Sequence, residues 1–394
     1  MVEDIIVDLV GNFADGKTTL VKALTNESAL RHSEEKKRGI TIRLGYAHFK
    51  LFKCNSCGKF SRFERCEFCG GSTELFRRVS IIDSPGHRML MTTMLSGIGL
   101  ADGAIMVISA INPCPQPQTE EHMEAINLLG IKNLVVAQTK VDLAGESKAK
   151  ENYNQIRAFL EKNGFSNTNI IPTFANQNIN IQEIIQEIGK FDISNRDVSG
   201  KPKMQVIRSF DVNKPGTRIE DLKGGVLGGG LVSGRLSVGD EVVLTPNVSA
   251  GSKFKSIRTK IMYIQSEFGE EKSATRGLSI GVLTKLDPSI VRRDALVGSL
   301  ITDADNLPIL DNKLRMTYDP IPGKTIFDKP LQKGESILIN VLSSRAIGII
   351  QDISKGGISL VLGEVSIPFF TGDKVIVSRK VKNAWTLAGS GIIL

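Results

Sequence analysis

Residues 11–18 read Gly11-Asn12-Phe13-Ala14-Asp15-Gly16-Lys17-Thr18, and this octet decides the fold of the first part of the chain. It directly follows the apolar run 5–10, so a strand, a tight glycine turn and the start of a helix come in that order. Backbone N–H groups and the helix N-terminus then surround the phosphates of a nucleoside triphosphate, while Lys17 supplies charge and Thr18 a magnesium ligand. The octet alone leaves kinases, ATPases and GTPases open.

Two later motifs distinguish between these three classes of protein. Asp83 follows the strand-like run 78–82 and is suited to holding magnesium, and the N–H group of Gly86 can meet a γ-phosphate. The run 135–138 leads into Thr139-Lys140-Val141-Asp142, where Asp142 can accept both N–H donors of a guanine edge and the Lys140 stem can cover the ring. Each motif alone is compatible with an ordinary turn after a strand, but their common order predicts a guanine nucleotide.

A candidate switch segment lies between these motifs, at Arg38-Gly39-Ile40-Thr41. The Thr41 hydroxyl is expected to complete the magnesium shell in the triphosphate state and to let go after hydrolysis. A threonine in an amphipathic strand that begins at Ile40 is the alternative interpretation.

The pattern of apolar runs predicts a multidomain protein, α/β followed by all-β. Runs at 5–10, 79–82, 104–109 and 134–137 alternate with helix-like segments at 17–25, 119–130 and 149–162, which indicates a parallel sheet. From about residue 204, short β-branched runs separated by glycine turns indicate two β-barrels. We expect domains at 1–198, 199–310 and 311–394.

Four of the five cysteines form two pairs, Cys54-x2-Cys57 and Cys66-x2-Cys69. Four thiolates from two such turns suit tetrahedral zinc, so we expect a zinc knuckle at 53–72, inserted in the first domain. Four free buried cysteines are the alternative, but the segment has few bulky apolar residues. Cys114 is expected to be unrelated to the metal.

Composition sets weaker limits. The formal charge of +8 permits an acidic partner such as RNA, yet basic runs such as 253–260 are equally explained by an exposed strand. No stretch reaches the roughly 18 to 20 apolar residues of a membrane span. The beginning of the chain is acidic where a signal peptide would be basic, so we expect a cytoplasmic protein that does not contact membranes.

The chain resembles a known family. The residues that carry the likeness are the switch segment 38–42, Asp83-Ser84-Pro85-Gly86-His87, the stretch 112–122, Ser209-Phe210-Asp211-Val212-Asn213-Lys214-Pro215-Gly216, the glycine-rich stretch 221–229, and Val377-Ser378-Arg379-Lys380. They are similar to the gamma subunit of archaeal and eukaryotic translation initiation factor 2, nearly over the whole length. That family carries its cysteine knuckle at the same place.

The resemblance implies a GTPase that joins alpha and beta subunits and delivers methionyl initiator tRNA to the small ribosomal subunit. It further implies hydrolysis of GTP to GDP on start-codon selection, and dependence on GTPase-activating and nucleotide-exchange factors. The resemblance also implies that the beta subunit binds the first domain and the alpha subunit the second.

Residue roles are implied position by position. His87 would position the attacking water, and Thr18, Gly39, Thr41 and Asp83 would surround Mg²⁺. Tyr46 and Gly228 would lie near the aminoacyl end of the tRNA. The nucleotide set comprises Gly11, Ala14, Asp15, Gly16, Lys17, Thr18, Thr19, Gly86, Thr139, Lys140, Asp142, Phe174, Ala175 and Asn176.

The departures from the family cluster on the nucleotide. Asp15 stands where the family usually has histidine, Phe13 where it has valine, and Thr139 where it has an asparagine that braces the phosphate loop. Phe174 replaces a serine. We expect guanine specificity with altered affinity or slow hydrolysis. Two other interpretations are a GTP-binding assembly scaffold with impaired hydrolysis and an elongation or selenocysteine-type tRNA carrier.

Overall fold

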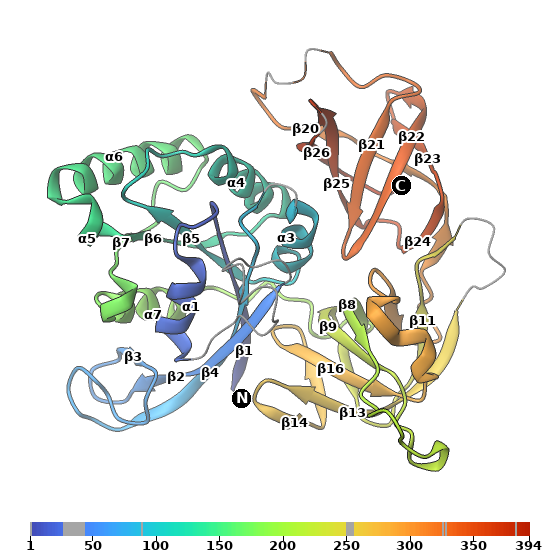
Figure 1. Ribbon diagram of the computed structural model, residues 1–394, viewed down its shortest axis with the longest axis horizontal. Helices are drawn as coiled ribbons and strands as arrows, with labels where there is room; N and C mark the ends of the chain where they lie inside the picture. Colours follow the sequence, from blue (N-terminus) through green and yellow to red (C-terminus); the bar gives the residue numbers. More distant parts are fainter. Residues whose placement is uncertain are drawn as a thin grey trace. The chain divides into compact units, whose positions relative to one another are not determined.

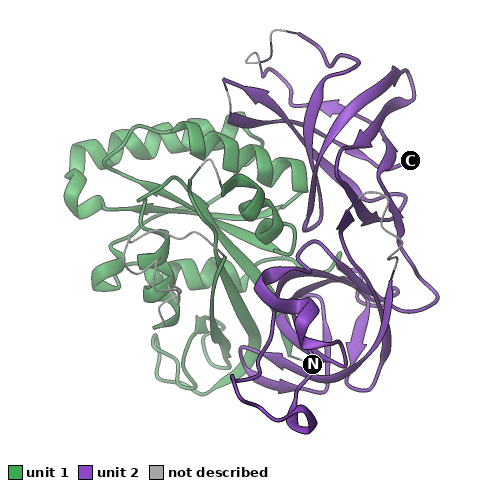
Figure 2. Cartoon of the chain, turned by 45° about the vertical axis from the view of Figure 1, so that its right-hand side comes forward, with its two compact units in different colours: residues 1–195 green, residues 196–394 purple. Residues whose placement is uncertain are grey.

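The computed structural model describes residues 2–26, 44–87, 90–249, 256–324, 327, 329–382 and 384–394. It divides into two compact units, Met1–Asn195 and Arg196–Leu394 (Figure 2). The first unit ends at Asn195, three residues before the domain end at residue 198 that the sequence predicts.

The first unit is built on a seven-stranded sheet of order β3-β2-β4-β1-β5-β6-β7 (Figure 1). Strands β4, β1, β5, β6 and β7 are parallel, and β2 returns antiparallel to β4. The chain moves from β1 to β4 on one side and to β5 on the other, so loops at the carboxyl ends of these strands meet beside β1. The strands are β1 Glu3–Gly11, β2 Gly45–Cys54, β3 Phe60–Ser61, β4 Thr73–Asp83, β5 Gly103–Ser109, β6 Asn133–Thr139 and β7 Ile170–Pro172.

Helices cover both faces of this sheet (Figure 1). Helix α7 buries Ile181, Ile184, Ile185 and Ile188 along one side, and together with α1 it packs on one face of β1, β4 and β5. Helix α4 has proline at its first turn and ends at Gly130, whose φ of 77° is left-handed. The helices are α1 Lys17–Thr25, α3 Met91–Ile98, α4 Pro117–Leu129, α5 Val141–Ala144, α6 Glu146–Lys162, η2 Ala175–Gln177 and α7 Ile181–Gly189.

The second unit contains two β-barrels with separate apolar cores. In the first barrel, strand β11 pairs with both β17 and β13, so the sheet β11-β17-β8-β9-β16-β13 closes on itself. Its elements are β8 Lys203–Phe210, η3 Ile219–Asp221, β9 Val226–Ser233, β10 Arg235–Ser237, β11 Glu241–Thr245, β12 Val248–Ser249, β13 Ile257–Ser266, β14 Gly269–Glu271, β15 Ser273–Thr275, β16 Ser279–Thr284, η4 Pro288–Asp294 and β17 Leu300–Thr302.

The second barrel has the order β19-β23-β22-β21-β25-β26-β20, and a bridge between Met316 and Ile393 joins its two sides. Strand β24 pairs with β18 and also with β12 of the first barrel, which ties the two barrels into one unit. The elements are β18 Ile309–Asp311, β19 Lys313–Met316, β20 Asp319–Pro320, β21 Ser336–Val341, β22 Ser344–Ser354, β23 Gly357–Leu362, β24 Val365–Phe369, β25 Lys374–Val381 and β26 Ala384–Ile392.

Candidate functional site

The loop between β1 and α1 has the geometry of a phosphate-binding loop. Lys17 Nζ donates to the carbonyl oxygens of Gly11 and Asn12, both at 2.8 Å, so the buried side chain folds back over the loop. Gly16 has a φ of 97°, which favours glycine, and a Cβ at Gly11 would lie 2.1 Å from the Val107 carbonyl oxygen. The two glycines are therefore required by the backbone itself.

Two of the four residues predicted to bind magnesium, Thr18 and Asp83, meet at the end of β4. The Thr18 hydroxyl donates to Asp83 Oδ2 at 2.7 Å, which places two oxygen ligands of the kind that Mg²⁺ prefers side by side. A Cβ at Gly86 would lie 2.7 Å from the Gly11 carbonyl oxygen and 2.8 Å from the Phe13 backbone nitrogen, so only glycine allows this approach to the phosphate loop. Gly39 and Thr41 lie outside the described residues. His87 follows Gly86 and is exposed.

A pocket of about 110 Å³ lies where a guanine base is expected. The ends of β6 and β7 bring together side chains far apart in sequence, because parallel strands end at one edge of the sheet. Lys140 Nζ donates to the Ala14 carbonyl oxygen at 2.7 Å, which joins this pocket to the phosphate loop. The lining residues are Gly16, Thr19, Thr139, Lys140, Asp142, Leu143, Phe174, Ala175 and Asn176. Leu143 is the member that sequence reasoning missed.

Thr139 takes over the bracing of the phosphate loop. Its hydroxyl donates to the Asp15 carbonyl oxygen at 2.6 Å, a contact between residues 124 positions apart. The buried His122 adds a second brace, because its Nδ1 accepts the N–H of Gly11 at 2.7 Å. Burial lowers the pKa of His122 to about 3, so this ring is neutral and can accept. The sequence stretch 112–122 contains this histidine, but no local pattern assigns it a role.

The unusual Asp15 is buried in the phosphate loop. Burial raises the pKa of its carboxyl to about 6, and the positive charges of Lys17 and Lys140 oppose this rise. At neutral pH the group is mainly ionised and adds a negative charge to the loop. The Phe13 ring, by contrast, is 47% exposed.

The four paired cysteines form one cluster in the hairpin between β2 and β4. Their sulfur atoms all lie within 4.8 Å of one another, with Cys54 to Cys69 at 3.5 Å and Cys57 to Cys66 at 3.6 Å. Four sulfurs around a tetrahedral zinc stand about 3.8 Å apart, so the donor set fits this metal. Cys114 is buried elsewhere, where its N–H group donates to Gln155.

The cysteine hairpin is anchored to the helices beside the nucleotide site. Arg62 Nη1 donates to the carbonyl oxygens of Ala23 and Leu24, at 2.7 and 2.8 Å, in the last turn of α1. Gln186 of α7 bonds both the N–H and the carbonyl of Phe60. The hairpin therefore satisfies carbonyl groups that the end of α1 would otherwise leave open.

Comparison with known proteins places the chain in a family. Residues 3–192 match the elongation factor Tu GTP binding domain, and residues 321–393 match the C-terminal domain of initiation factor eIF2 gamma. Translation initiation factor 2 subunit gamma of Pyrococcus furiosus is 41% identical over 99% of this chain and 97% of its own length; that of Methanocaldococcus jannaschii is 42% identical over 99% and 97%. The chain belongs to the translation initiation factor 2 gamma family. It is a GTP-dependent initiation factor subunit with a GTPase domain and two β-barrels, and the GTPase domain implies GTP or GDP with Mg²⁺.

Solved structures agree in fold. The bacterial selenocysteine-specific elongation factor matches with a TM-score of 0.76 at 26% identity, over 99% of this chain and 58% of that one. Elongation factor SelB of Methanococcus maripaludis, bound to a GTP analogue, matches with a TM-score of 0.76 at 22% identity, over 100% of this chain and 79% of that one. Within the described residues, no helix has the length and apolar character needed to cross a membrane.

Asp15→Asn is expected to raise GTP affinity about tenfold at pH 7.5, because it removes a negative charge near the phosphates. At pH 5.5, below the pKa of about 6, the wild-type carboxyl is mostly protonated and the gain shrinks. Titration with a fluorescent GTP analogue at both pH values measures the ratio of the variant's affinity to the wild-type affinity. The ionisation of the phosphates affects both proteins equally and cancels in this ratio. An equal ratio at both pH values contradicts this prediction.

Cys57→Ser is expected to abolish most zinc binding, since three thiolates and a hydroxyl hold the metal weakly. Metal analysis of purified protein should find about one zinc ion per chain in the wild type and much less in the variant. Cys114→Ser is the matched control and should keep its zinc. A zinc-free wild type grown with zinc would count against the assignment.

Proposed function

We propose that the chain binds methionyl initiator tRNA in its GTP form, delivers it to the small ribosomal subunit and hydrolyses GTP on start-codon selection. One observation carries the proposal: the guanine pocket and the Thr18–Asp83 pair are assembled around one phosphate loop, in a chain that matches gamma subunits over 99% of its length. A cytoplasmic location and regulation by GTPase-activating and nucleotide-exchange factors belong to the same proposal.

Each part of the site then has a task. Lys17 and the loop N–H groups hold the phosphates, while Asp142 and Lys140 recognise the base. Thr18 and Asp83 hold Mg²⁺, with Gly39 and Thr41 completing the switch. Mg²⁺ held there would supply positive charge that offsets the charge developing on the phosphates. His87 orients the attacking water, and the four cysteines hold a structural Zn²⁺ that keeps the hairpin folded.

The tRNA contacts involve one residue in each unit. Tyr46 lies on β2 and is partly exposed, so its ring is accessible for stacking. Gly228 lies on β9, where an added Cβ would stand 3.3 Å from the Arg208 Cβ. Each of these two positions, taken by itself, is a proposed contact for the aminoacyl end of the tRNA.

A comparison of tRNAs tests the function. The GTP-bound protein, assembled with alpha and beta subunits, should bind methionyl initiator tRNA at least about tenfold more tightly than elongator methionyl-tRNA, and GDP should weaken this binding. Binding is measured by protection of the aminoacyl bond from hydrolysis. A preference for elongator or selenocysteinyl tRNA would instead support the elongation-type alternative.

The buried Asp15 favours a second candidate, a GTP-bound scaffold that hydrolyses slowly. Its charge opposes that of the phosphates in the same loop. Single-turnover hydrolysis with ribosomes and the activating partner distinguishes the two candidates. Stimulated turnover supports the carrier, whereas GTP that stays intact while tRNA is bound supports the scaffold.

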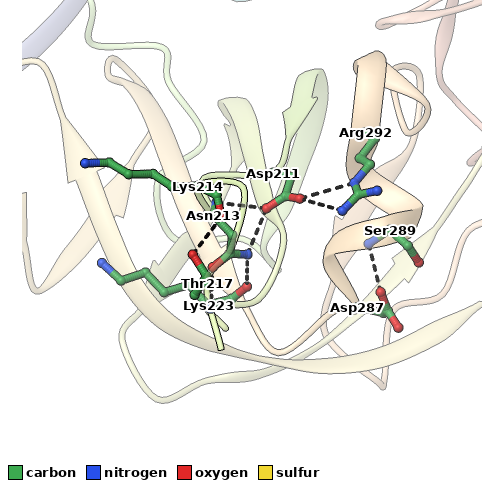
Figure 3. A network of polar contacts seen from close by, with 8 residues as sticks. All are labelled: Asp211, Asn213, Lys214, Thr217, Lys223, Asp287, Ser289 and Arg292. Atoms are coloured by element: carbon green, nitrogen blue, oxygen red, sulfur yellow. Dashed lines mark hydrogen bonds and ion pairs between the residues drawn. The ribbon is translucent and has the colours of Figure 1, made fainter. Parts of the chain in front are cut away.

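The loop 211–223 of the first barrel is the candidate contact for the alpha subunit (Figure 3). Asp211 accepts bonds from the Asn213 N–H at 2.9 Å and from Arg292 Nη2 at 3.1 Å, and Asn213 Oδ1 accepts the N–H of Lys223 at 2.8 Å. These bonds hold the loop in one shape. At its tip, Ile219 is 89% exposed. A fixed loop with an exposed apolar side chain suits a protein partner, because little ordering entropy is lost on binding.

Ile219→Asp is expected to weaken alpha-subunit binding about tenfold or more without changing GTP affinity. Ile347→Asp is the matched control, since Ile347 is also an exposed isoleucine, at 50%, but lies on β22 of the other barrel. Calorimetric titration with purified alpha subunit measures both. Equal loss in the two variants would show that the loop is not the contact.

A further inference from the structure

Asp8 is a carboxylic acid in the middle of an apolar strand, and the site described above gives it no role. It lies in β1, three residues before the phosphate loop, and none of its surface is exposed. A buried carboxyl is costly unless other groups compensate it. Such a residue at the base of a nucleotide site requires an explanation.

The first contact of Asp8 is with the segment that carries the magnesium ligand. The Ser84 hydroxyl donates to Asp8 Oδ2 at 3.0 Å, and the Ser84 N–H donates to the carbonyl oxygen of Leu9 at 3.3 Å. Ser84 directly follows Asp83, which accepts the Thr18 hydroxyl. Residues 83 and 84 are therefore held by hydrogen bonds to β1 and to Thr18 of α1.

The second contact is with helix α3. A Cβ at Gly97 would lie 3.0 Å from Asp8 Oδ2, and also 3.0 Å from Ser84 Oγ and from Leu44 Cδ2. Glycine at this position lets the helix rest on the pair. Leu44 is the first described residue after the candidate switch segment. Helix α3 and Leu44 thus lie close to the Asp8–Ser84 pair.

We propose that Asp8 is a positioning residue for the GTPase reaction: through Ser84 it sets where Asp83 and Gly86 stand beside the phosphate loop. It touches neither phosphate nor metal ion, and acts through the hydrogen bond to the Ser84 hydroxyl. The inference rests on the GTPase function proposed above.

The charge around the pair supports a neutral Asp8. Burial raises its pKa well above the usual value, the Ser84 hydroxyl opposes this rise, Asp83 adds to it and Lys17 opposes it. Helix α3, which packs against the pair, carries no charged residue over Met91–Ile98. A neutral carboxyl leaves the positive charge of Lys17 available for the phosphates, so an amide should replace it.

The test uses Asp8→Ala, Ser84→Ala, the double variant and Asp8→Asn in the full-length protein. The readout is the Mg²⁺ concentration at which release of a fluorescent GDP is slowed half-maximally. This concentration reports on Asp83, and measuring it requires no hydrolysis. Each alanine variant is expected to raise it about tenfold, the double variant no further, and Asp8→Asn less than about threefold. Non-additivity and rescue by asparagine separate positioning from a general loss of stability.

Ser80→Ala is the matched control. Ser80 is a buried serine on the same strand as Asp83, and its hydroxyl has no hydrogen-bond partner among the described residues. It should leave the Mg²⁺ requirement unchanged. Wild-type values in Asp8→Ala, or effects of Asp8→Ala and Ser84→Ala that simply add, would overturn the inference. If no protein, the wild type included, hydrolyses GTP while the alanine variants still need more Mg²⁺, the result counts against the proposed function and not against the role of Asp8.

Discussion

Asp142→Asn is expected to reduce GTP affinity by about 100-fold or more and to create affinity for xanthosine triphosphate. Asp142 lines the pocket proposed for the guanine base, where its carboxylate is suited to accept two N–H groups of the base. Each charge-assisted bond contributes about 1.5–3 kcal/mol, so the loss of both exceeds a factor of 100. Asparagine presents an N–H group, which opposes the guanine amino group but matches the oxygen that xanthine carries at that carbon.

Competition between a fluorescent nucleotide and either GTP or xanthosine triphosphate measures this reversal. Glu146→Gln is the matched control, because it removes one exposed carboxylate four residues away, outside the pocket lining. The control should keep the preference for GTP. An Asp142→Asn protein that also keeps it would show that another group reads the base.

His87→Ala is expected to slow GTP hydrolysis about 100-fold or more and to change GTP affinity by less than about twofold. A positioned imidazole typically contributes a factor of this size to proton transfer or water orientation. His87 directly follows Gly86, which lies against Lys17 of the phosphate loop, and its side chain is exposed. Loss of rate without loss of affinity is the signature of a group that acts only in the transition state.

Single-turnover phosphate release in the presence of ribosomes and the activating partner measures the rate, and nucleotide titration measures the affinity. His48→Ala replaces another histidine of the same unit, on β2, and should retain the wild-type rate. A normal rate in the His87 variant would remove it from the mechanism and leave the water to be oriented by backbone groups.

The sequence motifs proposed for the nucleotide site are contiguous and their geometry is local, so the residues that the structure brings together there could be named from the sequence. Gly16, Lys17 and Thr18 act within one turn of chain, and Asp83 and Asp142 each follow a recognisable strand. The comparisons confirm the family and the fold class. The residue roles remain proposals, and the predicted switch residues Gly39 and Thr41 fall outside the described part of the chain.

The remaining features depend on contacts between distant segments. His122 reaches Gly11 across 111 positions and Arg62 reaches Ala23 across 39, so no local spacing indicates either contact. Asp8 was hidden in a run that looks apolar. Strand β4 starts at Thr73, well before the predicted run at 78–82, because its polar early part contacts other segments: Arg77 pairs with Glu3 and also donates to the carbonyl of Phe191.

The closed ring of the first barrel limits how this protein can bind partners. Each of the strands β11, β17, β8, β9, β16 and β13 has a hydrogen-bonded neighbour on both sides. A partner therefore cannot extend this ring with a strand of its own, which also protects the ring from edge-to-edge aggregation. Recognition on this barrel is left to loops and outward side chains, and these can change in sequence without disturbing the main-chain bonds of the ring.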